Sequence, residues 1–507
     1  MNPSTPVIVG VGQVVERIGE AEWQGRSAAD LAAWAAERAI ADAGAARDLK
    51  PSIEVVSAIR TFEDSGAAPS PFGKPDKFPL AVARRAGLKP KQAILEAVGG
   101  QSPVTALVEM AERVARGEIA AGMVFGAEAI SNARHLSSQG EARDWAEHDE
   151  GEIEDRGSAR MLTKQGIVHG IVSAPIAYAL LENARRARLG MSREDYRAAM
   201  GELFAPFSAV AAQNPYSSAA GEPLSAGAIA TITPKNRMIA DPFPLKVVAR
   251  DQVNMGAAML VMSAAAAREA GIPEDRWVYI HGASASAEPD ILERADLGAY
   301  PAAEAALDAA LGAALGAAGK SIGEVEVLDF YSCFPIAVYS TAIDHLGLSQ
   351  DDPRGLTVTG GLPYFGGAGN GYSSHAIAST VERLRERPGA FGLVGANGGF
   401  QSKYAALVLS TAPAQFAGWS EAVQHRPAPP ELADLVEGSG TIETYTVVHG
   451  RGGPTYAVAI GRLSDGRRFI ARSDDPATLA AMEADDPLGR QVALSNDGER
   501  NAFTLAG

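Results

Sequence analysis

The stretch GEIAAGMVFGAEAISNA, residues 117–133, sets the pattern for the first part of the chain. Its apolar run between small residues is typical of a buried strand, and it follows TALVEMAERVARG, whose apolar residues recur at helical spacing. Earlier, VIVGVGQV at residues 7–14 predicts a buried strand, and a helix is expected from about Ala28 to Ala45. This alternation predicts an α/β fold built on a largely parallel, layered sheet.

A second region repeats this order. It is expected to open with VNMGAAMLVMSAAAAREAGI, a strand followed by a helix, and to continue with strands in WVYIHGAS, EVEVLDF, AFGLVGANGGF and YAALVLST. We therefore expect two similar α/β halves, at residues 1–135 and 241–412. Residues 136–240 between them begin with an acidic run from Glu141 to Asp155, expected to be a solvated loop, and continue as mostly helical sequence. This change of pattern between the halves predicts that residues 136–240 form an inserted loop domain.

The pattern changes again towards the C-terminus. A proline-rich linker is expected at residues 413–430, followed by the alternating segments TIETYTVVHG, TYAVAIGRL, RRFIARS and RQVALS with turn signals such as SDG and NDG between them. Five short strands and the helical stretch PATLAAMEA predict a small OB-like β domain over residues 431–507, with a sandwich as the alternative.

Composition narrows the possible partners. A formal charge of -16 and a pI near 5.1 leave no basic surface for nucleic acid. No apolar run approaches the roughly 20 residues of a membrane span, and the N-terminal residues lack signal-peptide features, so a cytoplasmic protein is expected. The single cysteine, Cys333, excludes an intrachain disulfide, and the eight histidines show no metal-ligand spacing. Small molecules and proteins remain as partners, and no metal is expected.

Four segments resemble thiolase motifs and occur in the order of that superfamily. GEIAAGMVFGAEAISNA resembles the segment that ends in glycine, an acidic residue and serine, and VNMGAAMLVMSAAAAREAG resembles the stretch reading asparagine, aspartate, glycine, alanine, alanine. DFYSCF at 329–334 resembles a loop with a phenylalanine, and GGLPYFGGAGNGYSSH at 360–375 resembles the glycine and histidine loop. The resemblance spans residues 1 to about 412. It is closest to the thiolase-like proteins of type 1, which add a C-terminal domain to a degenerate thiolase core.

This resemblance implies a fold, a ligand and an assembly. The fold is five-layered, with two βαβαβαββ halves and a loop domain over the pocket. The ligand is a CoA thioester, bound as substrate or carried as acyl-CoA, with no covalently bound cofactor. Thiolases usually form dimers, so a homodimer is one expectation and a monomer is the other.

The same resemblance implies that this chain lacks the catalytic side chains of thiolases. Counting back eighteen positions from Gly117, both ends included, places Gly100 where thiolases carry the nucleophilic cysteine. Gly367 stands where thiolases carry the histidine that activates that cysteine. Ala396 or Asn397 stands where they carry the cysteine of their last motif. A thiolase needs a thiolate to hold the acyl group and an imidazole to lower its pKa. The standard acyl-enzyme reaction is therefore not expected.

The remaining candidates for chemistry are Cys333, Tyr331 and Tyr364. The loop YSCF resembles the histidine, aspartate, cysteine, phenylalanine loop of sterol-carrier-protein type thiolases, whose cysteine moves protons, and Tyr331 stands where they have histidine. The related steroid side-chain aldolases use tyrosines for proton transfer, which makes Tyr331 and Tyr364 candidates for similar roles. The alternative is that Cys333 is a small buried hydrophobe and Tyr331 a packed aromatic residue.

The glycine loop at residues 366–371 and its neighbours are candidates for contacts with the substrate. Backbone N–H groups of this loop, together with a helix expected to start near Tyr372, could stabilise an enolate oxygen, although a tight turn would use the same glycines. His375 in that helix is either a ligand contact or a core residue, and Asn397 either donates to a thioester oxygen or belongs to a turn. The predicted binding residues are Gly100, Gly366, Gly367, Gly369, Asn370, Gly371, His375 and Asn397.

Three functions are compatible with these residues. The first is an enzyme that acts on an acyl-CoA by retro-aldol cleavage or another enolate step. The second is a catalytically silent protein that binds CoA or acyl-CoA, and the third is a residual acyltransferase that uses Cys333 as nucleophile. The thiolase-like aldolases need a partner with an OB-type domain, and this chain resembles them in its C-terminal domain. That domain is therefore either a fused version of the partner or a structural cover.

Overall fold

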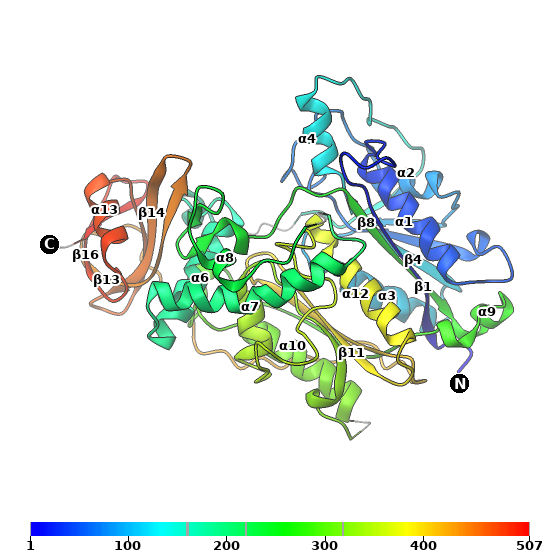
Figure 1. Cartoon of the computed structure of the whole chain (residues 1–507). Helices are drawn as coiled ribbons and strands as arrows, with labels where there is room; N and C mark the ends of the chain where they lie inside the picture. Colours follow the sequence, from blue (N-terminus) through cyan, green and yellow to red (C-terminus); the bar gives the residue numbers. More distant parts are fainter. Residues whose placement is uncertain (1, 159–161, 219–220, 317–318, 506–507) are drawn as a thin grey trace.

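The computed structural model describes residues 2–158, 162–218, 221–316 and 319–505 (Figure 1). The first part of the core alternates strands and helices, as the sequence predicts. Its elements are β1 (Pro6–Val15), α1 (Ala28–Asp42), β2 (Ile53–Ala58), α2 (Phe78–Arg85), β3 (Gln92–Leu95), α3 (Ser102–Ala115), β4 (Ala121–Glu128) and α4 (Ile130–Ser138).

The first sheet is mixed rather than largely parallel, because one of its strands comes from beyond the insertion. The strand order is β1-β8-β4-β2-β3-β5, where β8 is Met255–Ser263 and β5 is Glu154–Asp155. Strand β8 runs antiparallel to β1 and β4, whereas β2 is parallel to β3 and β4. The prediction that this segment opens the second half is wrong, since periodicity reveals a buried strand but not the sheet that it joins.

Helix α1 packs closely on this sheet because the sequence supplies small residues on both sides. The helix begins with a capping box, in which the Ser27 hydroxyl accepts a hydrogen bond from the Asp30 N–H and the Asp30 carboxylate accepts one from the Ser27 N–H. A β-carbon at Gly10 or Gly12 of β1 would lie 2.0 or 2.1 Å from a carbonyl oxygen of α1. Glycine at these positions therefore sets the distance between helix and sheet.

A second sheet repeats the order of the first in a less regular form. Its strand order is β10-β11-β12-β9, and residues 356–361 form an irregular segment where a further strand would complete the repeat. The buried carboxylate of Asp329, at the end of β10, holds this segment by accepting hydrogen bonds from its backbone and threonine hydroxyls. The elements are β9 (Tyr279–Ala287), α10 (Pro301–Leu311), β10 (Val325–Asp329), α11 (Pro335–Val338), α12 (Tyr372–Arg385), β11 (Phe391–Gly398) and β12 (Lys403–Ser410).

Helices α3 and α12 form the middle layer between the two sheets. Helix α3 contacts β4 and β8 on one side and β12 on the other, while α12 contacts β8 and β11. Helices α1 and α2 cover the outer face of the first sheet, and α10 covers the second. The core therefore has the predicted five-layered arrangement, with the βαβαβαββ order complete in the first half and one strand replaced by the irregular segment in the second.

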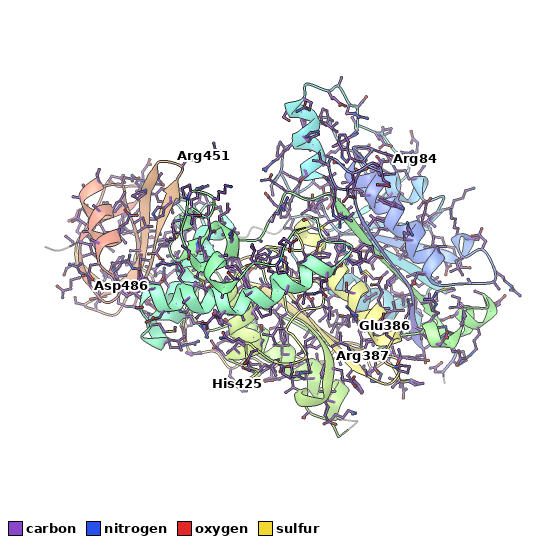
Figure 2. All side chains as sticks on the ribbon, in the orientation of Figure 1. Arg84, Glu386, Arg387, His425, Arg451 and Asp486 are labelled. Atoms are coloured by element: carbon purple, nitrogen blue, oxygen red, sulfur yellow. The ribbon has the colours of Figure 1, made fainter. Side chains whose placement is uncertain are left out.

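The acidic run from Glu141 to Asp155 is largely exposed, as predicted, but part of it is anchored to the core. The Asp149 carboxylate lies 2.7 Å from the Arg84 guanidinium, and Glu147 pairs with the same arginine. Arg84 lies on the surface of the first half (Figure 2). An ion pair at such an exposed arginine holds the loop in place but contributes little to stability.

The insertion that follows is helical and lies over the second half. Its helices α6 and α7 contact α11, which directly follows the loop that carries Tyr331 and Cys333. Among the described residues, no helix combines the length and the apolar character needed to cross a membrane. The elements are α5 (Lys164–Val168), α6 (Ala174–Leu189), α7 (Arg193–Gln213), α8 (Ala226–Ala230), β6 (Met238–Ala240) and β7 (Phe243–Pro244).

The C-terminal domain is a small closed barrel. Its strands pair in the order β14-β15-β17-β16-β13, and a further pairing of β13 with β14 closes the ring. The helix lies between the third and fourth strands, and the third and fifth strands pair in parallel, which gives an OB-like domain rather than a sandwich. The elements are β13 (Gly438–Gly450), β14 (Gly453–Leu463), β15 (Arg468–Ser473), α13 (Pro476–Ala484), β16 (Gln491–Asn496) and β17 (Asn501–Leu505).

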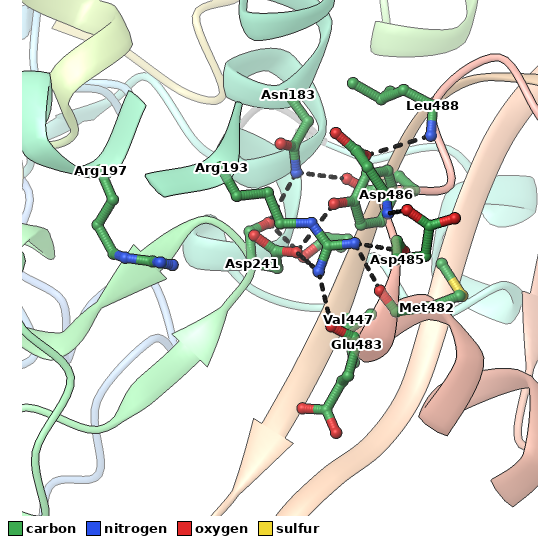
Figure 3. Close-up of polar contacts among 12 residues, drawn as sticks. Asn183, Arg193, Arg197, Asp241, Val447, Met482, Glu483, Asp485, Asp486 and Leu488 are labelled. Carbon is green, nitrogen blue, oxygen red and sulfur yellow. Dashed lines mark hydrogen bonds and ion pairs between the residues drawn. The ribbon is translucent and has the colours of Figure 1, made fainter. Parts of the chain in front are cut away.

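This barrel lies beside the helices of the insertion (Figure 1), and buried polar contacts join the two, because the Asn183 Nδ2 donates to the Tyr445 carbonyl at 2.9 Å. The Arg193 guanidinium donates to the backbone carbonyls of Met482, Glu483 and Asp485 over 2.5 to 3.3 Å (Figure 3). The fully buried Arg186 side chain forms an ion pair with Asp486 at 2.5 Å. Because such desolvated charges are costly to leave unpaired, the barrel and the insertion are expected to hold together as one body.

Candidate functional site

Gly100 and Tyr331 face each other across the interface of the two halves. Gly100 lies between β3 and α3, and Tyr331 follows β10. A β-carbon at Gly100 would lie 2.5 Å from the Tyr331 hydroxyl oxygen and 2.4 Å from the carbonyl oxygen of Asn397. The tyrosine hydroxyl therefore occupies the space into which a side chain at position 100 would project, and glycine is required there.

Cys333 belongs to a buried polar network centred on the Asn397 amide. The Asn397 Nδ2 donates to the Tyr178 hydroxyl at 2.7 Å and to the Cys333 Sγ at 3.5 Å. The Asn397 Oδ1 accepts a hydrogen bond from the Tyr300 hydroxyl at 2.8 Å. The amide is thus held on both sides, and the structure brings two predicted residues, Cys333 and Asn397, into direct contact.

Neither tyrosine of this network is predicted from the sequence. Tyr178 comes from helix α6 of the insertion, and its ring stacks on Phe334 with centroids 4.4 Å apart. Tyr300 comes from the turn before α10, and its hydroxyl also lies 2.8 Å from the Lys403 carbonyl. Neither residue lies in a recognisable motif, and each reaches the network only through the packing of elements distant in sequence. Their place in the site therefore becomes visible only in the structure.

Burial keeps the thiol and the phenol of the site protonated. Desolvation raises the pKa of Cys333 to about 12, although hydrogen bonds with Tyr178 and Asn397 oppose the shift. Desolvation also raises the pKa of Tyr331 well above its ordinary value. At neutral pH both groups are consequently proton donors, and Cys333 is a weak nucleophile because the thiolate is the reactive form.

The glycine loop is tied to the residues around Gly100. The Asn370 Oδ1 accepts a hydrogen bond from the Gly99 N–H at 3.0 Å, and the Ser373 hydroxyl donates to the Gly100 carbonyl at 2.6 Å. Helix α12 begins at Tyr372, as predicted. The loop therefore positions the backbone of Gly100 from the second half of the core.

Backbone N–H groups of the same loop have partners within the protein. The Gly367 N–H donates to the Arg250 carbonyl at 2.7 Å, and the Gly369 N–H donates to the Gly367 carbonyl at 2.8 Å. Gly366 and Gly369 have φ values of 123° and 54°, which favour glycine. These contacts are those of a tight turn, and a role for the loop in ligand binding stays a prediction.

His375 and Tyr364 lie outside the Asn397 network. The His375 Nδ1 lies 2.9 Å from the Gln13 Oε1 of the first sheet, and burial lowers its pKa to about 3. The Tyr364 ring packs edge-on against Phe204 of the insertion, and its hydroxyl has no hydrogen-bond partner among the described residues. His375 therefore has the surroundings of a neutral core histidine, whereas Tyr364 retains an uncommitted hydroxyl.

The five-layered core, together with solved structures of similar shape, defines a thiolase-fold protein. The dimeric peroxisomal thiolase of Saccharomyces cerevisiae has a TM-score of 0.56 at 14% identity, covering 81% of this chain and 98% of the thiolase. The Ltp2-ChsH2(DUF35) aldolase has a TM-score of 0.55 at 18% identity, covering 81% of this chain and 98% of the aldolase chain. At these identities the likeness concerns the fold.

A monomeric SCP2-thiolase-like protein type 1 from Mycobacterium smegmatis is much more similar. It is 41% identical with a TM-score of 0.84, and the match covers 100% of both chains. Residues 420–499 also match the family described as the thiolase-like protein type 1 additional C-terminal domain. The chain belongs to the SCP2-thiolase-like proteins of type 1. A comparison with curated protein sequences found no match.

Proposed function

We propose that the chain acts on a CoA thioester by acid–base chemistry at the acyl group, with Tyr331 as the proton donor. The observation that carries this proposal is the position of the Tyr331 hydroxyl in the space facing Gly100. In the thiolase resemblance, that space belongs to the nucleophile and hence to the reacting acyl carbon. A proton donor there would meet the same atoms that a thiolate attacks in a thiolase.

Retro-aldol cleavage of a 3-hydroxyacyl-CoA fits a donor in that position. The bond between Cα and Cβ breaks, the 3-hydroxyl proton leaves as the carbonyl of an aldehyde or ketone forms, and the resulting enolate takes a proton from Tyr331 at Cα. The base for the 3-hydroxyl proton would be the deprotonated form of Cys333 or Tyr364, which burial makes a minor species at neutral pH. Because burial raises the pKa of both groups, turnover should increase with pH across the range in which the protein stays folded.

A second candidate is a silent CoA-binding or acyl-CoA-binding protein. It is favoured by the hydrogen bonds of Asn397, whose amide is already engaged by Tyr178 and Tyr300. The third candidate, an acyltransferase with Cys333 as nucleophile, requires a thiolate that burial disfavours. Alkylation of this thiol with loss of activity but without any acyl adduct would favour proton transfer over acyl transfer.

The deciding experiment combines calorimetry with mass analysis. CoA, acetyl-CoA and a long-chain or steroidal 3-hydroxyacyl-CoA are titrated into the protein, and each mixture is then analysed for cleavage and for deuterium uptake at Cα in D₂O. We expect cleavage that falls about 100-fold or more in Tyr331→Phe, since a general acid typically contributes 10²–10⁴-fold. Tyr404→Phe is the matched control, because Tyr404 is buried in the same half and lies outside the proposed machinery.

Each outcome selects one candidate. Binding with unchanged ligand and no deuterium uptake would establish the silent binder and contradict the enzyme. Equal cleavage by wild type and Tyr331→Phe would remove the proposed donor. Failure to bind any of the three ligands would contradict a CoA-dependent function altogether.

We further propose that the chain is a monomer whose barrel replaces a separate partner domain. The related protein from Mycobacterium smegmatis is monomeric, and the aldolase above is named after two proteins, Ltp2 and ChsH2(DUF35). The contacts of Arg186 and Arg193 attach the barrel firmly to the insertion. Light scattering at several concentrations should give the mass of one chain, and a dimeric mass would contradict the proposal.

A further inference from the structure

A cavity adjoins the turn between β11 and β12. It has a volume of about 440 Å³ and is bordered by the start of α5, the segment after β9 and the turn that contains Phe400. Leu162, Ile291 and Phe400 supply apolar walls. This volume lies within the range of about 300–1,000 Å³ that is usual for small-molecule sites.

Arg294 lines this cavity and is not fully satisfied by the protein. The residue is 4% exposed, its Nε donates to the Pro289 carbonyl at 3.1 Å, and its Nη2 donates to the Phe400 carbonyl at 2.9 Å. The buried Nη1 has no hydrogen-bond partner among the residues that the structure describes. Since an unpaired buried donor of a charged group is costly, the arrangement points to an acceptor supplied from outside the chain.

The charges around the cavity favour an anion. Lys164 and Lys403 join Arg294 as positive groups, and Glu288 and Asp290 are the negative ones. Both carboxylates are already engaged, because Glu288 accepts from the Ala302 N–H at 2.6 Å and Asp290 accepts from the Leu292 N–H at 3.1 Å. The three cations therefore outnumber the two anions, and the unpartnered donor belongs to a cation.

We propose that this cavity binds an organic anion with an apolar segment. Its carboxylate or phosphate accepts hydrogen bonds from the Arg294 Nη1 and from Lys403, while Leu162, Ile291 and Phe400 cover the apolar part. The site does not depend on the CoA proposal, because none of its residues belongs to the Tyr331 and Cys333 centre. It adjoins that centre through Phe400, whose ring lies edge-on to Tyr178 with centroids 6.4 Å apart.

Lys403 is suited to this role for two reasons. Its ammonium donates to the Val98 carbonyl at 3.2 Å, which leaves further N–H groups for a ligand. Burial lowers its pKa, and a bound anion nearby would oppose this shift by stabilising the charged form.

The test is a calorimetric titration of the full chain with octanoate, octyl phosphate and 1-octanol. We expect at least one of the two anions to bind about tenfold more tightly than octanol, because the alcohol lacks the charge that pairs with Arg294. Tight binding of octanoate alone identifies a carboxylate ligand, tight binding of octyl phosphate alone identifies a phosphate ligand, and equal binding identifies a general anion site. Failure of both anions to bind, or equal binding of octanol, would overturn the proposal.

Variants locate the binding in this cavity. Arg294→Gln should weaken binding of the preferred anion about tenfold or more, since it removes a charged hydrogen bond. Lys403→Met should weaken it less while keeping the apolar stem, and it provides the test if Arg294→Gln does not fold. Arg387→Gln, at an exposed position just after α12 (Figure 2), is the control, because Arg387 does not line the cavity. Unchanged affinity in both cavity variants would place the binding elsewhere and overturn the proposal.

Discussion

The two halves of the core share one order of elements, yet they carry opposite chemistry where they meet. In the first half, the loop between β3 and α3 presents Gly99 and Gly100, which have no side chains. In the second half, the loop between β10 and α11 presents Tyr331 and Cys333, and Tyr331 extends into the space that the first half leaves open. The glycine of one half is thus matched by a large side chain from the other.

Tyr331 accounts for the packed interface beside Gly100, where a small residue alone would leave a hole. A cavity in the core would cost stability in proportion to its volume. The Tyr331 ring fills the space and meets Tyr372 edge-on with centroids 5.2 Å apart. Glycine at position 100 and tyrosine at position 331 therefore form one structural unit, which can be tested by changing either member.

The largest expected effect comes from returning a side chain to the first half. Gly100→Ala places a methyl group against the Tyr331 hydroxyl and the Asn397 carbonyl, and it should lower the free energy of unfolding by about 3 kcal/mol, at the upper end for overpacking. Urea denaturation measures this loss. Gly312→Ala is the control, because a β-carbon there meets nothing within 4 Å.

A double variant sharpens the same point. If Tyr331 holds the space, Gly100→Ala combined with Tyr331→Ala should lose at least about 1 kcal/mol less than the sum of the two single losses. Additive losses would mean that the two halves are not complementary at this position.

The second prediction concerns His375, a residue of the second half whose partner lies in the first. Its folded pKa of about 3 lies below the unfolded value of about 6.5, so the unfolded chain binds the proton first as the pH falls. Stability should therefore be lost as the pH falls through the window from 6.5 to 3, by roughly 2 kcal/mol at pH 5.

Unfolding of wild type and His375→Gln at pH 8 and pH 5 measures this loss. The wild type should lose more stability on acidification than the variant. His345→Gln is the control, because His345 pairs with Asp308 at the surface. If His375→Gln and wild type lose the same amount, the ring is not held neutral by burial.

Sequence patterns predicted the common order of the halves but not all of their contacts. Periodicity and composition located β1, α1 and the barrel strands, because these signals depend on local burial. They did not assign β8 to the first sheet, since its partners lie more than a hundred residues away along the chain. Sequence patterns therefore located elements more reliably than their partners.

The residues of the candidate site likewise divide into those that the sequence predicts and those that only packing brings together. Cys333, Tyr331 and Asn397 could be singled out because they lie in or next to motif positions. Tyr178 and Tyr300 could not, because their role depends on how the insertion and the turn before α10 pack on the second half. The unpaired Nη1 of Arg294 is likewise a property of packing, which leaves no local pattern.

The third prediction uses the thiol of the second half. Its folded pKa of about 12 lies above the unfolded value of about 9, so the unfolded chain releases the proton first as the pH rises. The contribution is fully present below pH 9 and is lost between pH 9 and 12, amounting to about 1.4 kcal/mol at pH 10. Wild type should lose more stability than Cys333→Ala between pH 7 and pH 10 in chemical unfolding, and parallel losses would contradict a buried neutral thiol.

The smallest expected effect is that of Asn397→Ala, which removes the amide joining the insertion to the second half. Tyr178 keeps its hydrogen bond to the Gly399 carbonyl and Tyr300 keeps the one to the Lys403 carbonyl, so both hydroxyls stay satisfied. The loss of stability should therefore be only about 1 kcal/mol, the net value of ordinary hydrogen bonds. The effect on Cys333 should be more visible, because its Sγ loses a donor that favours the thiolate and its alkylation should become slower. Asn496→Ala in the barrel is the control. A loss as large as that of Gly100→Ala would contradict the prediction, because it would show that the network contributes as much stability as the packing of Tyr331 on Gly100.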